Sequence, residues 1–197
     1  GRWKIEVGAS SGKSYIAMYL AAQWATTDAA TALICHHELM RKRMEQQLLL
    51  EIPGAEVQAE GDGASWLLLG GEKVVLVATI DGLLDLVLAD QEAWRGKFQG
   101  NGVIVDEGHL VFGKENRGEV AGQHRVEAEE IKGIVDILVE GGGRLVVFAD
   151  ENQLNVSSKH ITAPIYPAGC DSTPSVTATV RAKLRMNLRN PHTVRDA

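Results

Sequence analysis

The sequence predicts an α/β domain built around a mainly parallel central sheet. Short apolar runs that lack polar alternation recur along the chain, as expected for strands buried on both faces. Segments with the period of amphipathic helices separate these runs. Strands that alternate with helices usually pair in parallel, so we expect helices to cover both faces of the sheet.

The expected strands are short apolar runs. They cover residues 5–7, 31–35, 74–78, 103–105 and 145–148. All are far shorter than the roughly 20 apolar residues that a membrane-spanning helix needs, so the sequence predicts no membrane segment.

The expected helices lie between these strands. They cover residues 13–24, 37–50, 80–90 and 126–140. The last one has Ile131, Ile134, Val135 and Leu138 at spacings of three and four, which places them on one face. The glycine run 141–143 then predicts the end of this helix, directly before the strand at 145.

Length and composition narrow the classes of function. A chain of 197 residues can bury one α/β core, and 45% hydrophobic with 23% charged residues is typical of a soluble globular protein. The net charge of −6 argues against a protein that is basic overall, but it does not exclude a local basic groove. Cys35 and Cys170 form neither a disulfide framework nor a metal pattern, and Cys35 lies in an apolar run that predicts a reduced core residue.

The two ends of the chain also carry expectations. The sequence shows no signal-peptide pattern, which predicts an intracellular protein, cytoplasmic or nuclear. It begins almost on top of a strand, which favours a piece of a longer protein. The segment 113–125 reads as a polar loop, and the proline-bearing segment 155–176 reads as an extended surface excursion. We therefore expect one domain over 1–176, with 177–197 leading toward another unit.

The stretch GASSGKS at 8–14 joins the first expected strand to the first expected helix. A glycine-bearing turn into a helix N-terminus directs backbone N–H groups at one point and favours an anion. Gly12, Lys13 and Ser14 match the second half of the phosphate-loop pattern G-x-x-x-x-G-K-[ST], whereas Val7 stands at its first glycine. In that pattern the lysine reaches the β- and γ-phosphates and the hydroxyl binds Mg²⁺. The alternative is a polar turn with a surface lysine.

Two acids follow the strand expected at 103–105. Asp106 and Glu107 would lie at the carboxyl end of that strand, where ligands of parallel α/β sheets bind. A nucleotide site needs one carboxylate for the Mg²⁺ shell and another that orients and deprotonates the attacking water. Asp106 suits the first task and Glu107 the second. The alternative is a solvated acidic turn.

A third group of residues follows the strand expected at 145–148. Gln153 could hydrogen-bond a γ-phosphate without adding charge, and Arg189 could stabilise charge on a transferred phosphoryl group. Taken singly each pattern is weak, because a glutamine after a strand is usually just solvated. Their order along the chain adds to their weight.

In that order, the motifs resemble those of the first RecA-like motor domain of superfamily 1 helicases and their helicase-like ATPase relatives. The matching stretches are VGASSGKS (7–14), ALICHH (32–37), VLVATIDGLL (75–84), VIVDEGH (103–109), FADENQL (148–154) and MNLRNPHTV (186–194). The resemblance covers essentially the whole chain. It implies a three-layer P-loop NTPase fold of RecA type, with ATP and Mg²⁺ as cofactors.

The resemblance also implies roles for single residues. The residues implied to cradle the phosphates are Gly8, Ala9, Ser10, Ser11, Gly12, Lys13 and Ser14. Ser14 and Asp106 are implied to hold Mg²⁺. Among the catalytic residues, Glu107 is implied to activate water and Gln153 to couple the γ-phosphate to movement. Arg189 is implied to contact that phosphate from the domain junction.

The implied partners are single-stranded nucleic acid and a second RecA-like domain of the same parent chain. In the family, the threonine at the position of Thr79 contacts the nucleic-acid backbone, and the region of His37 belongs to the same surface. The sequence does not distinguish DNA from RNA. His109 stands where the superfamily usually has glutamine, and it either links the motif VIVDEGH (103–109) to the motif FADENQL (148–154) or packs. His36 and His37 read as ordinary loop residues.

Departures from the family pattern leave three functions open. Ala149 and Ser10 replace family glycines, which predicts reduced affinity and rate. The upstream adenine-contacting motif and most of a second domain are absent from this sequence, so we expect poor hydrolysis by this chain alone. The candidates are an ATP-driven nucleic-acid motor, a helicase-like NTPase switch that does not unwind, and a non-catalytic nucleotide-binding module.

Overall fold

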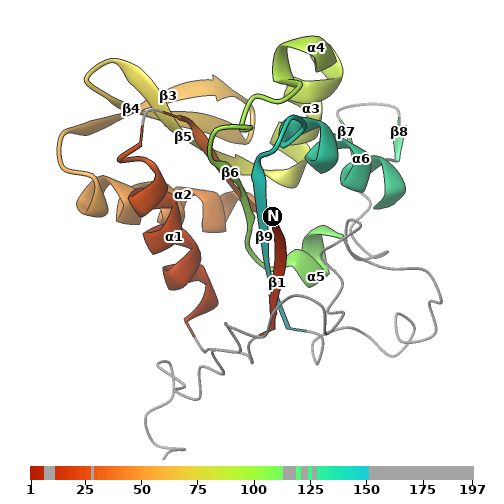
Figure 1. The fold of residues 1–197 in the computed structure, drawn as a ribbon, viewed down its shortest axis with the longest axis horizontal. Coiled ribbons are helices and arrows are strands. Elements are labelled where there is room, and N and C mark those ends of the chain that lie inside the picture. The colour runs from red at the N-terminus through yellow and green to blue at the C-terminus, as the bar shows by residue number, and fades with distance from the viewer. Residues whose placement is uncertain (7–11, 28, 113–118, 121–123, 126–127, 151–197) are drawn as a thin grey trace, which may run out of the picture.

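The computed structural model describes residues 1–6, 12–27, 29–112, 119–120, 124–125 and 128–150 (Figure 1). The main strands are β1 (Arg2–Glu6), β2 (Thr31–Cys35), β3 (Ala55–Gly61), β4 (Ala64–Leu69), β5 (Glu72–Thr79), β6 (Gly102–Val105) and β9 (Arg144–Ala149). The helices are α1 (Lys13–Trp24), α2 (Glu38–Glu51), α3 (Ile80–Ala89), α4 (Gln91–Trp94), α5 (Gly108–Val111) and α6 (Ala128–Leu138). A separate two-stranded pair consists of β7 (Glu119–Val120) and β8 (His124–Arg125).

The main sheet has seven strands in the order β1-β9-β6-β2-β5-β4-β3. The first five strands in this order, which are β1, β9, β6, β2 and β5, pair in parallel. The last two, β4 and β3, pair antiparallel. The prediction of an α/β fold with a mainly parallel sheet is therefore confirmed. We call the side where the five parallel strands end the carboxyl edge and the opposite side the amino edge.

The predicted elements appear with small shifts of their ends. The helix expected at 13–24 and the strand expected at 31–35 have those bounds, while the first strand occupies Arg2–Glu6 instead of 5–7. The hairpin of β3 and β4 was not predicted. Four of the seven residues of β3 are polar or glycine, and most of its positions are exposed, so it lacks the apolar run of a buried strand. The segment 113–125, expected as a loop, contains β7 and β8.

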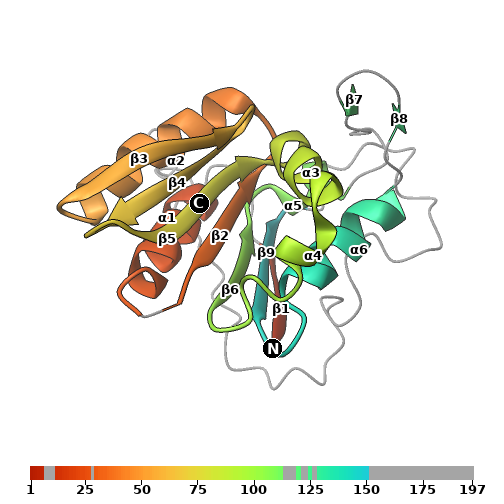
Figure 2. The same cartoon turned by 90° about the horizontal axis from the view of Figure 1, so that it is seen from above.

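Two hydrophobic clusters lie on opposite faces of the sheet. In β2, Leu33 and Cys35 belong to the cluster that includes side chains of α1 and α2, and Ala32 and Ile34 belong to the other. The second cluster includes side chains of α3, α4, α5 and α6. Figures 1 and 2 show α1 and α2 on one side of the strands and α3, α4 and α6 on the other. Cys35 is a buried free thiol, as predicted.

The second cluster contains a group of stacked aromatic rings. Trp66 of β4 lies against Trp94 of α4 with ring centroids 6.5 Å apart and planes inclined by 12°. Phe98 contacts both, with centroids 6.1 Å from Trp66 and 6.4 Å from Trp94. The Lys73 ammonium lies 5.3 Å from the ring centroid of Trp66. These contacts fasten the β3–β4 hairpin to the α3–α4 side of the sheet.

The turn between β3 and β4 packs directly on the first turn of α3. A Cβ atom at Gly82 would come within 2.6 Å of the backbone oxygens of Asp62 and Gly63, so only glycine fits there. The Thr79 amide donates to the Gly63 carbonyl at 2.8 Å. The Thr79 hydroxyl accepts the Gly82 N–H at 3.0 Å and caps α3. The hairpin turn is thereby held at the carboxyl edge.

At the amino edge, a polar network joins α1, β6 and β9. The Asn101 amide donates to the Trp24 carbonyl at 3.0 Å and to the Thr27 hydroxyl at 2.6 Å. It also donates to the Ala29 carbonyl. The Arg144 guanidinium donates to both the backbone and side-chain oxygens of Asn101 and lies 4.4 Å from the ring centroid of Trp24.

None of the helices in the described part of the chain has both the length and the apolar character needed to cross a membrane.

Candidate functional site

The topology brings three chain segments together at the carboxyl edge. Strand β9 lies between β1, which leads toward α1, and β6, which leads to the two adjacent acids. Val105 of β6 pairs with Val147 of β9 and with Ile34 of β2, so these neighbouring strands end near the same level. The start of α1 and the residues that follow β6 and β9 therefore surround one region.

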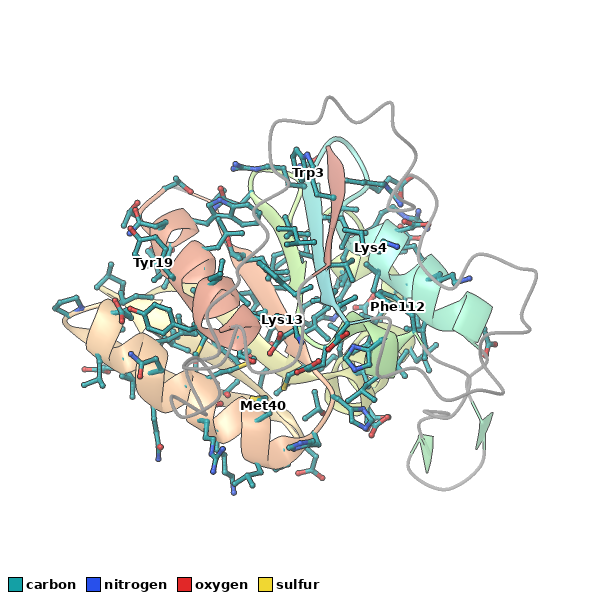
Figure 3. The ribbon with its side chains drawn as sticks, turned by 90° about the horizontal axis from the view of Figure 1, so that it is seen from below. Trp3, Lys4, Lys13, Tyr19, Met40 and Phe112 are labelled. Carbon is teal, nitrogen blue, oxygen red and sulfur yellow. The ribbon has the colours of Figure 1, made fainter. Side chains whose placement is uncertain are left out.

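Lys13 is the first residue of α1 and points into this region (Figure 3). It follows Gly12, whose φ of 88° is left-handed and suits glycine at the sharp entry into the helix. The Lys13 Nζ lies 3.8 Å from Glu107 Oε2 and 3.9 Å from Asp150 Oδ2, and its side chain is only 4% exposed. The amine of Lys13 thus lies between one acid after β6 and another after β9.

Asp106 is fully buried directly after β6. Neither of its oxygens has a hydrogen-bond partner of ordinary geometry among the described residues. Burial raises the pKa of Asp106 from 3.8 to about 6, and the carboxylate of Glu107 adds to this rise. The nearby Ser14 hydroxyl and the Lys13 ammonium act in the opposite direction.

This arrangement suits a hard cation. A buried carboxylate beside a hydroxyl supplies oxygen ligands of the kind that Mg²⁺ prefers. Within the described ranges, no three His, Cys, Asp or Glu side chains come together as a metal site of their own. Mg²⁺ usually takes only one or two protein carboxylates and completes its shell with water and substrate phosphates, so Ser14 and Asp106 fit it.

Glu107 has an unusual backbone conformation. Its φ of 50° is left-handed, and no other non-glycine residue in the described part of the chain has a positive φ. Such a conformation costs on the order of 1 kcal/mol and often occurs at functional sites. The side chain of Glu107 is 23% exposed, and its Oε2 accepts no hydrogen bond from the described residues. The carboxylate can therefore reach solvent while it lies beside Lys13.

His109 connects the two acid-bearing segments. Its Nδ1 accepts the backbone N–H of Asp150 at 3.2 Å and lies 3.4 Å from Glu107 Oε2. Its ring is buried, and its Nε2 has no hydrogen-bond partner among the described residues. The sequence left open whether His109 links two motifs or only packs. In the structure, its hydrogen bond with Asp150 links the segment after β6 to the segment after β9. A role of this link in coupling stays a prediction.

Asp150 was missed as a site residue. It follows the apolar strand β9 in the same way that Asp106 follows β6, and this parallel was the available signal. Its side chain is 3% exposed and forms the ion pair with Lys13. In the motif FADENQL, only Gln153, three residues after Asp150, was predicted to have a role.

Several expected site residues lie outside the described residues. These are Gly8, Ala9, Ser10, Ser11, Gln153 and Arg189. The expected excursion at 155–176 and the domain boundary near 176 lie outside as well. The roles assigned to these residues stay predictions.

The two residues expected at a nucleic-acid surface have local structural tasks. Thr79 is buried and caps α3. His37 is exposed and caps α2, because its Nδ1 accepts the Met40 N–H at 3.3 Å. His36 precedes this cap, and burial lowers its pKa. A contact between these residues and nucleic acid stays a prediction.

Comparisons with known proteins add two distant structures. No protein-family model and no curated protein sequence matches the chain. The ATPase domain of the large terminase of Thermus phage P74-26 aligns with 17% identity and a TM-score of 0.37, over 76% of this chain and 59% of that one. An arginine-to-alanine variant of the same domain aligns with 15% identity and a TM-score of 0.36, over 76% and 60%. The chain thus spans about three-fifths of the length of these structures, and we base the proposed function on the carboxyl edge itself.

Proposed function

We propose that this chain is the ATP-binding and hydrolysing motor domain of a superfamily 1 helicase-like protein. The proposal includes the three-layer RecA-type arrangement of a P-loop NTPase. One observation carries it: the Lys13 amine at the entrance of α1 lies 3.8 Å from Glu107, the neighbour of the buried Asp106. A lysine and two adjacent acids that meet at a helix entrance are what binding of a triphosphate with Mg²⁺ requires.

The residues present fit both parts of this ligand. Lys13 would hold the phosphates together with the first backbone amides of α1, and Ser14 and Asp106 would hold Mg²⁺. Mg²⁺-ATP supplies the phosphoanhydride bond that is hydrolysed. Bound Mg²⁺ would favour the charged carboxylate of Asp106 and so counteract the rise in pKa that burial causes.

Glu107 is the residue that would activate water. Its carboxylate is partly exposed beside Lys13, whereas Asp106 is closed off from solvent. A general base must reach the proton of the attacking water, so Glu107 suits this task better than Asp106. Gln153 and Arg189 keep their proposed roles in sensing the γ-phosphate and stabilising its charge.

The decisive test is the nucleotide affinity of Lys13→Ala. We expect calorimetry to detect no binding of Mg²⁺-ATP to this variant, because the cation that faces the phosphates is gone. Lys42→Ala is the matched control, since Lys42 lies on α2 with 62% of its side chain exposed, and it should bind like the wild type. A thermal melt checks that each variant is folded, and Lys13→Met provides a second, bulkier replacement. Unchanged ATP affinity in folded Lys13 variants would refute the proposed site.

A second function, a helicase-like NTPase switch that does not unwind nucleic acid, is favoured by the charges near Thr79. The Thr79 hydroxyl already accepts the Gly82 N–H, and the neighbouring side chains of Asp62, Asp81 and Asp85 are acidic. Burial raises the pKa of Asp81, and the nearby Asp85 adds to this rise. Such a surface is unfavourable for a phosphate backbone.

The two functions differ in how nucleic acid affects hydrolysis. A motor predicts that single-stranded DNA or RNA stimulates ATP hydrolysis in the full-length parent protein, which would include the proposed second RecA-like domain. Absence of stimulation by either nucleic acid would exclude the motor and leave the switch. Binding of ATP without any hydrolysis, even with the second domain present, would instead favour a non-catalytic module.

A further inference from the structure

One nitrogen atom of His109 faces two different groups. The backbone N–H of Asp150 donates to Nδ1 at 3.2 Å, and Glu107 Oε2 lies 3.4 Å from the same atom. A ring nitrogen that accepts a hydrogen bond uses its single lone pair and carries no proton. The neutral ring therefore has its proton on Nε2. Nδ1 then has no proton to offer Glu107.

The position of Glu107 is consequently not maintained by His109. A carboxylate oxygen and an imidazole lone pair 3.4 Å apart repel each other when no proton lies between them. The Lys13 ammonium lies 3.8 Å from the same Oε2 atom and attracts it. Among these described contacts, Lys13 holds Glu107 in place while Nδ1 opposes that position.

We propose that His109 is a positioning residue that directs Glu107 toward the attacking water when Lys13 engages a phosphate. The inference rests on the proposed function and deepens it. When Lys13 turns from Glu107 to a phosphate, the attraction that holds Glu107 beside Nδ1 weakens and the repulsion remains. Glu107 then moves to its solvent-exposed side. The Asp150 amide keeps Nδ1 an acceptor throughout, so no proton has to move.

In this arrangement, His109 helps to make Glu107 available as the general base only after nucleotide has bound. Without nucleotide, Lys13 keeps the general base in an ion pair beside Nδ1 of His109. With nucleotide, the same lysine binds phosphate and the base becomes available. His109 acts through Glu107 and has no contact of its own with the reacting atoms in this scheme.

The first test is the tautomer of His109 in nucleotide-free protein. Nitrogen NMR of the full chain labelled in histidine, at pH 8, should show a bare Nδ1 and a protonated Nε2 for this residue. His109→Gln identifies the signal, because it disappears from the spectrum of that variant. A proton on Nδ1 would overturn the proposal. This measurement needs no ATP, so its result is separate from the success or failure of the proposed function.

The second test separates catalysis from binding. His109→Leu removes the acceptor at Nδ1, and we expect about a tenfold lower kcat with the dissociation constant for Mg²⁺-ATP unchanged within about twofold. His109→Gln keeps an acceptor and should recover most of the rate. In the Glu107→Gln background, His109→Leu should have no further effect, because the group it positions is gone.

The opposite results would overturn the positioning role. These are an equal rate loss in both backgrounds, or a loss of ATP affinity as large as the loss of kcat. His109→Asn serves as a third variant if a thermal melt shows that the leucine variant is unfolded. Failure of wild-type protein to bind ATP would instead contradict the proposed function, whatever the tautomer of His109.

Discussion

Asn101 at the amino edge and Asp106 at the carboxyl edge are both buried polar residues, but their hydrogen bonding differs. At the amino edge, the two N–H groups of the Asn101 side chain are shared among three acceptors, and the backbone and side-chain oxygens of Asn101 accept from Arg144. At the carboxyl edge, both oxygens of Asp106 and Nε2 of His109 have no hydrogen-bond partner of ordinary geometry among the described residues. The same five parallel strands run between these edges.

The difference separates stability from ligand binding. Leaving a buried polar group without a partner costs about 1–3 kcal/mol, so a fold selected for stability alone would avoid it. The network around Asn101 avoids that cost and connects α1, β6 and β9. At the carboxyl edge the buried polar groups keep this unfavourable free energy, which a charged ligand that interacts with them could remove. We therefore expect substitutions at the amino edge to change stability, and substitutions at the carboxyl edge to change chemistry.

The largest effect is expected for Glu107→Gln. The variant should bind Mg²⁺-ATP but hydrolyse it at least about 10²-fold more slowly, because the amide cannot accept the proton of the attacking water. Single-turnover hydrolysis together with calorimetry measures the two properties separately. Glu92→Gln, on the exposed helix α4, is the control and should hydrolyse ATP at the wild-type rate. A wild-type rate in Glu107→Gln would remove Glu107 from the role of base.

A stability effect is expected at the amino edge for Asn101→Ala. The change removes the donor to three oxygens and one acceptor of Arg144, so unfolding free energy should fall by about 3 kcal/mol. Urea unfolding measures this value. ATP affinity should stay within about twofold of the wild type, since the network lies at the other edge. If Asn101→Ala is as stable as the wild type, the contrast between the edges is wrong.

Asp106→Asn should stabilise the protein, in a pH-dependent way. The unfolded Asp106 loses its proton near 3.8 and the folded one near 6, so between these values the folded state binds more protons. Its contribution to stability is present below 3.8 and is lost as pH rises through about 6. Without Mg²⁺, the free energy of unfolding of the variant should exceed that of the wild type by about 3 kcal/mol at pH 7.5 and by much less at pH 4. Urea unfolding at pH 4 and pH 7.5 measures this difference in stability. An equal difference at both pH values would contradict the prediction.

The smallest effect is expected for Thr79→Ala. Loss of the helix cap should lower the unfolding free energy by about 1 kcal/mol, and Thr79→Ser should restore most of it because the hydroxyl returns. Thermal unfolding of the two variants measures the difference. If Thr79 also contacts a nucleic-acid backbone, Thr79→Ala weakens binding of single-stranded DNA or RNA as well. Filter binding then shows whether this position has more than a structural task.

The sequence predicted the parallel part of the fold because buried strands are apolar on both faces. The runs that contain Leu33, Ile104 and Val146 have this property, and they occur in the structure as β2, β6 and β9. Strand β3 is largely exposed on both faces and lies at the end of the sheet, so its side chains give no such signal. Its place is set by the adjacent strand β4 and by contact between the hairpin turn and Gly82, which lies about 20 residues further along the chain.

The candidate site was predicted in part for a similar reason. Lys13, Asp106 and Glu107 belong to local patterns with a known chemical logic, and the structure brings them together. The ion pair of Asp150 with Lys13 depends on β9 lying between β1 and β6, and strand order cannot be read from a local pattern. The left-handed backbone of Glu107 is also invisible in the sequence, because glutamate rarely adopts it.

The stacked pair of Trp66 and Trp94 gives the protein a built-in optical probe. The two indole rings, 6.5 Å apart, are held in a fixed packing, so they should contribute to the near-ultraviolet circular dichroism band of the folded protein. The pair joins the β3–β4 hairpin to α4, and both rings are largely shielded from water. Their contribution will therefore disappear when the hairpin separates from the rest of the sheet. It can follow that event in unlabelled protein.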